Sequence, residues 1–78
     1  MASDQMRFAY GDAVRVIDAA PSRFRLLTNG SIVGISTIAT PAASELFGQP
    51  VGTPIYVIED AKGASCEVPE PYLSKAGE

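Results

Sequence analysis

The chain has 78 residues and a formal net charge of −3. This length allows one domain, which buries only about 60% of its unfolded surface and is near the lower limit of independent stability. An acidic chain lacks the lysine and arginine surplus that displaces counterions from nucleic acid. No stretch approaches the roughly 20 apolar residues that span a bilayer, and the N-terminus shows no secretory signal. We therefore expect a soluble, cytoplasmic protein that binds neither nucleic acid nor a membrane.

The residue types that are missing restrict the chemistry further. The sequence contains no histidine and a single cysteine, Cys66. A disulfide within the chain and the Ser-His and Cys-His nucleophile pairs are therefore excluded, and a metal site is not expected. Glu67 follows Cys66, and a neighbouring negative charge raises the pKa of a thiol. We expect no cofactor and no enzymatic activity, and we interpret Cys66 as an unreactive thiol.

The chain begins with a short polar segment followed by one strand and a long loop. Residues 1–6 are small and polar, which predicts a disordered tail. The first strand is predicted at 13–18, where valines alternate with an arginine. Residues 19–29 then form a loop, and Asn29-Gly30 is expected to turn the chain into the next strand. Loops of this length often carry a binding surface.

The second predicted strand, at 31–38, is apolar on both faces. Its alternation places Ile32 and Ile38 on one face, with Val33 and Ile35 on the other. Gly34 lies in the middle, where we expect a bulge or a sharp bend. A strand that is apolar on both faces is buried twice, once in its own domain and once against another surface.

A short helix is predicted at 41–47. Thr40 is a suitable N-cap, Pro41 suits the first helical position, and Gly48 ends the helix. About two helical turns are too short to be stable without packing against the rest of the domain. We therefore expect this helix to be an insertion between two strands and to lie against the core.

The C-terminal third is predicted to form a hairpin and a hook. Residues 54–59 and 65–68 are expected strands, joined by a turn at 60–63. Two prolines then stop the pairing, and a 3₁₀ turn at 71–73 leads into a last short strand. The domain is expected to end at residue 74, with 75–78 as a tail. In the third strand, Ile55 and Val57 are placed on the face opposite Tyr56 and Ile58.

These elements predict an all-β, SH3-like barrel of five strands over residues 7–74, with one helical insertion near 41–47. The order of three motifs resembles the C-terminal barrel of nitrile hydratase β subunits. The motifs are Gly11-Asp12-Ala13-Val14-Arg15-Val16, Ile55-Tyr56-Val57 and Tyr72-Leu73. The resemblance implies the barrel fold and does not imply an activity.

A second resemblance implies an alternative function. Gly11 to Arg15 is similar to the opening of type II dihydrofolate reductases, which are short SH3-like chains that assemble four subunits around one pore. Their active strand reads Val-Gln-Ile-Tyr, where this chain has Ser65-Cys66-Glu67-Val68. The resemblance at Gly11 to Arg15 implies a pore-type reductase as one alternative function. Small acidic SH3-like chains also occur among bacterial immunity proteins and mobile gene-cassette products, so an immunity protein that neutralises a toxin is another.

The apolar residues exceed what the core of a small barrel needs, and an apolar patch on a small protein marks an interface. The predicted interface residues are Ile17, Phe24, Ile32, Ile38, Leu46, Phe47, Tyr56 and Ile58. In the alternative interpretation, Leu46 and Phe47 cover the strand residues within the same chain. The loops at 19–29 and 40–53 are expected to contribute to the contact surface.

Four charged residues are candidates for contact with an anion or a protein partner. They are Arg23 and Arg25 on the long loop and Glu67 and Glu70 near the C-terminal hook. Ordinary solvation of these side chains is the alternative. We expect a small, non-catalytic bacterial-type binding module that contacts another copy of itself or another protein. Nothing in the sequence supports a small-molecule ligand.

Overall fold

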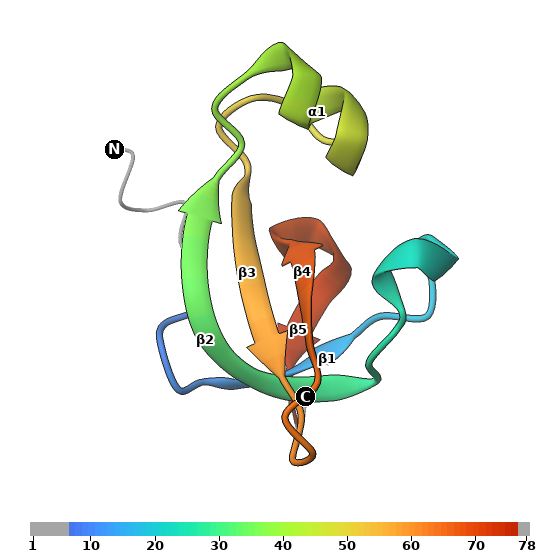
Figure 1. The fold of residues 1–78 in the computed structure, drawn as a ribbon, viewed down its shortest axis with the longest axis vertical. Coiled ribbons are helices and arrows are strands. Elements are labelled where there is room, and N and C mark those ends of the chain that lie inside the picture. Colours follow the sequence, from blue (N-terminus) through green and yellow to red (C-terminus); the bar gives the residue numbers. More distant parts are fainter. Residues whose placement is uncertain (1–6, 77–78) are drawn as a thin grey trace.

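Five antiparallel strands form one sheet in the order β4-β3-β2-β1-β5 (Figure 1). This computed structural model describes residues 7–76; the predicted tail at 1–6 and the last two residues of the predicted tail at 75–78 lie outside the described residues. The strands are β1 (Ala13–Val16), β2 (Asn29–Thr37), β3 (Pro54–Glu59), β4 (Ser65–Pro69) and β5 (Leu73–Lys75). The helical elements are α1 (Pro41–Phe47) and the 3₁₀ turns η2 (Ser22–Phe24) and η3 (Glu70–Tyr72). The predicted all-β class with one short helix is confirmed.

The two edges of the sheet are β4 and β5, and no strand pairing among residues 7–76 joins them. The last strand continues to Lys75, one residue past the predicted end of the domain at 74. The backbone N–H of Ala76 donates to the carbonyl of Ala13 at 3.0 Å, which extends the pairing with β1. The first part of the predicted tail at 75–78 therefore lies against the sheet.

Helix α1 has the boundaries that its capping residues predict. The Thr40 hydroxyl accepts a hydrogen bond from the backbone N–H of Ala43 at 3.1 Å, and Pro41 opens the helix. Gly48 ends it in the left-handed conformation with φ of 70°, and its N–H donates to the Ser44 carbonyl at 2.8 Å. Only a residue without Cβ adopts this conformation at little cost. Local chemistry therefore determines both ends of α1.

Thr40→Ala is expected to lower the free energy of unfolding by about 1 kcal/mol, because one N-terminal donor of the helix loses its acceptor. Urea denaturation followed by circular dichroism measures the change. Thr40→Ser is the matched control, since it keeps the accepting hydroxyl. Equal destabilisation by both variants would contradict the capping role.

A β-bulge in β2 decides which residues face the core. Ile32 pairs with Ile58 in β3, but the next pair joins Gly34 to Val57, which leaves Val33 as an extra residue in β2. This confirms the irregularity expected at Gly34. An extra residue reverses the alternation of side chains along a strand. Ile35 therefore packs against the same core as Ile32, and its predicted placement on the opposite face is wrong.

The second strand also begins earlier than predicted. Asn29 and Gly30 pair with Arg15 and Val14 of β1, so the expected turn at Asn29-Gly30 is a regular part of β2. At Gly30 the neighbouring strand is very close, because a Cβ atom built there would lie 2.7 Å from the backbone oxygen of Glu59. The absence of a side chain at Gly30 thus allows β2 to lie close to β3, and Gly30 does not form a turn.

The core collects residues from all five strands and from the segments that flank β1. Its buried members are Phe8, Val14, Val16, Ala20, Phe24, Ile32, Tyr56, Ile58, Val68 and Leu73. Half-buried apolar residues, including those of η3 and α1, pack against this cluster. In the part of the chain that the structure describes, no helix has the length and apolar character needed to cross a membrane.

Candidate functional site

An apolar groove is lined by residues of η2, α1 and β4 and by the segment that follows η2, and we call it the η2–α1 groove. Its lining residues are Arg23, Phe24, Leu26, Leu46, Phe47, Cys66 and Glu67. The groove has a volume of about 290 Å³. It is built from three segments that are distant in the sequence, and the folded sheet brings them together.

The base of the groove is a set of stacked aromatic rings. The Phe24 ring stacks with Phe47 at a centroid distance of 6.1 Å and with Tyr72 at 5.5 Å. The hydroxyl of Tyr72 accepts a hydrogen bond from the Gln49 side-chain amide at 3.1 Å. Stacked pairs of this kind contribute about 0.5–1.5 kcal/mol each beyond area burial. The rings therefore connect η2, α1 and η3, and Phe24 and Phe47 form the aromatic base of the groove.

Two exposed leucines stand beside these rings. Leu26 is 75% exposed and Leu46 is 63% exposed, which are the highest values among the large aliphatic side chains of residues 7–76. Both line the η2–α1 groove. Apolar side chains grouped on a small protein surface mark an interaction site. Leu26 is not among the predicted interface residues. It is an apolar residue in the 19–29 loop, which was expected to contribute to the contact surface, so its position in the sequence could have identified it.

The groove also carries two charges of opposite sign. The guanidinium of Arg23 lies over the Phe24 ring, 4.7 Å from its centroid, which is a cation–π geometry. Glu67 lines the same groove from β4. Among the described residues, neither Arg23 nor Glu67 forms an ion pair; the pair that does form joins Lys75 and Asp12 at 3.8 Å. Both groove charges are therefore available to a partner.

The predicted interface residues divide into two groups. Phe24, Leu46 and Phe47 come together in the groove; Phe24 is itself buried in the core, and contact of the three with a partner remains a prediction. The strand residues Ile32, Ile38, Tyr56 and Ile58 are instead buried by their own chain, and Ile17 is half-buried against the core. The structure thus differs from the expected outward apolar face. The reason is that a domain this small needs the large side chains of both central strands to fill its core.

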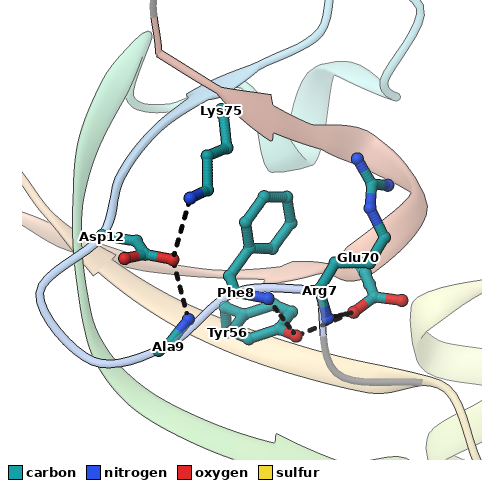
Figure 2. Close-up of polar contacts among 7 residues, drawn as sticks. All are labelled: Arg7, Phe8, Ala9, Asp12, Tyr56, Glu70 and Lys75. Atoms are coloured by element: carbon teal, nitrogen blue, oxygen red, sulfur yellow. Dashed lines mark hydrogen bonds and ion pairs between the residues drawn. The ribbon is translucent and has the colours of Figure 1, made fainter. Parts of the chain in front are cut away.

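Glu70, a predicted contact residue, is engaged inside the protein. Its Oε2 accepts hydrogen bonds from the Tyr56 hydroxyl at 2.7 Å and from the backbone N–H of Arg7 at 2.9 Å (Figure 2). The Phe8 N–H donates to the Tyr56 hydroxyl at 3.4 Å, and the Phe8 and Tyr56 rings meet edge to face at 5.3 Å. Glu70 therefore ties the segment before β1 to β3 and η3.

Arg25 is likewise occupied within its own loop. Its Nε donates to the Ala20 carbonyl at 2.8 Å, which closes the loop around η2. A second tie joins β5 to the turn before β1, where Asp12 pairs with Lys75 and accepts from the Ala9 N–H at 2.9 Å (Figure 2). Of the four predicted charged contact residues, the groove brings together Arg23 and Glu67 and leaves out Arg25 and Glu70.

The environment of Tyr56 stabilises its neutral form. Burial of the hydroxyl, then the hydrogen bond to Glu70 and the charge of that carboxylate, raise the pKa of Tyr56 to about 12. The unfolded-state pKa of tyrosine is about 10. A pKa that is higher in the folded state gives stability that is fully present below pH 10 and is lost as pH rises from 10 to 12.

Tyr56→Phe is expected to cost about 1–2 kcal/mol at pH 7, because the Phe8 N–H loses its acceptor and Glu70 loses a donor. Above pH 10 the wild type loses stability through Tyr56 and the variant does not, so their difference should shrink. Urea denaturation at pH 7 to 11.5 measures this trend. Tyr10→Phe, which removes an exposed phenol, is the matched control. A difference that stays constant with pH would contradict the role of the Tyr56–Glu70 bond.

Cys66 lies half-buried in the groove wall. Burial raises the pKa of the Cys66 thiol, and the negative charge of Glu67 adds to the increase. The thiolate is the reactive form, so this environment suppresses nucleophilic chemistry at neutral pH. Within residues 7–76, no three His, Cys, Asp or Glu residues are grouped so that they could hold a metal ion.

Comparison of the chain with protein-family models, with curated proteins and with solved structures finds no significant match.

Proposed function

We propose that the chain is a small, non-catalytic protein-binding module whose partner occupies the η2–α1 groove. The observation that carries this proposal is the meeting of two exposed leucines, a stacked aromatic base and two unpaired charges in one place. Protein interfaces combine aromatic and aliphatic anchors with a polar rim. The same combination offers no acid–base pair or activated nucleophile for catalysis.

The proposed fold is an SH3-like barrel. Its support is the long β2 strand, which pairs with β1 through Asn29–Ser31 and with β3 through Ser31–Thr37. One strand shared in this way belongs to two halves of the sheet, and the bulge at Val33 allows the sheet to bend between them. In the proposed barrel, this bend would bring η2 and α1 toward β4, where the groove lies.

Site-specific photocrosslinking in cells that express the protein tests the proposal. The photoreactive residue p-benzoyl-phenylalanine replaces Leu26 or Leu46 in the groove. As the matched control, it replaces Val51, which is 54% exposed and lies outside the groove. We expect discrete protein adducts from both groove positions and none of these from position 51. Mass spectrometry then identifies the captured chain as a second copy or as another protein.

The result that would overturn the proposal is a folded protein, shown by circular dichroism, that gives no groove adduct or the same adducts from all three positions. Because all three side chains are exposed, the replacements should leave the core intact. A negative result therefore cannot be attributed to misfolding.

A further inference from the structure

We infer that the occupant of the η2–α1 groove is a second copy of this chain, related to the first by a two-fold axis. The inference rests on the proposed function, since it names the partner of the same groove. In such a pairing each copy presents the same residues to the other, so the surface must be self-complementary. The charges, the apolar side chains and the free strand edge of this protein all meet that condition.

The charges favour a self-complementary partner. The groove carries Arg23 and Glu67, one positive and one negative side chain, and neither has an ion-pair partner among the described residues. A two-fold axis that passes through the groove brings Arg23 of each copy toward Glu67 of the other, which forms the same pair twice. A partner of one uniform charge would leave either Arg23 or Glu67 buried and unpaired, which is costly.

The apolar part of the groove fits the same arrangement. Leu26 and Leu46 are exposed on the single chain, and a two-fold axis places both leucines of each copy against the aromatic base of the other. Burying an exposed leucine against apolar side chains is favourable, because it removes apolar surface from water. A 78-residue chain with one cysteine and no histidine gains from this burial, because it lacks a disulfide or zinc site as an additional source of stability.

The edge strand β4 allows the interface to extend past the groove. The backbone N–H of Asp60 donates to the Ala64 carbonyl at 2.9 Å at the turn of the hairpin. The alternation of an antiparallel ladder then directs the backbone groups of Ser65 and Glu67 away from β3, at the open edge of the sheet. An open edge is a template for contact with another chain.

A charge-swap series tests the inference by sedimentation equilibrium of the full chain at several concentrations. The wild type is expected to be a dimer, and Arg23→Glu and Glu67→Arg should each raise the dimer dissociation constant at least about tenfold. The double variant that carries both swaps should recover most of the wild-type affinity, because it restores opposite charges across the axis. Leu26→Asp should dissociate the dimer, while Val51→Asp outside the groove should leave it unchanged.

Each outcome is informative. Recovery in the double variant supports the two-fold groove dimer, whereas a dimer in which the double variant is no stronger than the single variants overturns it. A wild type that is monomeric at all concentrations, yet crosslinks to a different protein from Leu26, overturns the second copy as occupant and leaves the proposed function standing. A monomer that gives no groove adduct overturns both.

Discussion

Ile58→Ala is expected to lower the free energy of unfolding by about 2–5 kcal/mol, since it removes a large side chain from a closely packed core and leaves a cavity. The Ile58 side chain is 0% exposed and lies in the core cluster with Ile32 and Val68. A domain of this size has a total stability of roughly 4–12 kcal/mol. The variant should therefore be partly unfolded near physiological temperature. Thermal and urea denaturation measure the effect.

Leu46→Ala is the matched control for this prediction. Both residues were assigned to one contact surface from the sequence, but Leu46 is 63% exposed on α1. At concentrations low enough for the protein to be monomeric, we expect a change within about 0.5 kcal/mol. Similar losses in both variants would show that Ile58 is not enclosed by the core as the structure has it.

Gly30→Ala is expected to cost about 1–3 kcal/mol, because the added methyl group meets backbone atoms that have no room to move. Its Cβ would lie 2.7 Å from the Glu59 carbonyl oxygen and 3.1 Å from the Glu59 nitrogen. Strands β2 and β3 would have to separate beside Glu59, the last residue of β3. The unfolding free energy measures the cost, and backbone chemical shifts near Glu59 locate it.

Two comparisons make the Gly30 prediction specific. Ser31→Ala, at the exposed neighbouring position, should change stability by less than about 0.5 kcal/mol. Gly34→Ala should be milder than Gly30→Ala, because its Cβ would meet the Val57 side chain at 3.1 Å and a side chain can adjust. We expect the loss of unfolding free energy to decrease in the order Gly30→Ala, Gly34→Ala, Ser31→Ala. A Gly30→Ala variant as stable as Ser31→Ala would contradict the close approach of the two strands.

Two pairs of similar residues show how the tertiary structure divides roles. Arg23 and Arg25 are two positions apart, yet Arg23 lies over the Phe24 ring in the groove and Arg25 bonds to the Ala20 carbonyl. Glu67 lines the groove, while Glu70 accepts from Tyr56 and from the Arg7 backbone. The sequence grouped all four as contact residues, because side-chain type alone does not indicate which atoms of the folded chain lie nearby.

The order and type of the secondary-structure elements were determined by local sequence. Helix α1 begins at a threonine cap and ends at Gly48, and its bounds at Pro41–Phe47 match the predicted 41–47. The β3–β4 turn likewise has Asp60 accepting from the N–H groups of Lys62 and Ala64, with Gly63 at φ of 89°. These features depend on hydrogen bonds and backbone angles within a few residues, so the sequence alone specifies them.

The tertiary structure alone decided which faces are buried and where the groove forms. One extra residue at Val33 reverses the alternation of β2, which turns Ile35 toward the core occupied by Tyr56 and Ile58. The alternation of apolar and polar residues in the sequence does not reveal such a shift, because the register is set only by pairing with the partner strand. The groove depends on the same register, because η2, α1 and β4 meet only when the sheet has bent around that core.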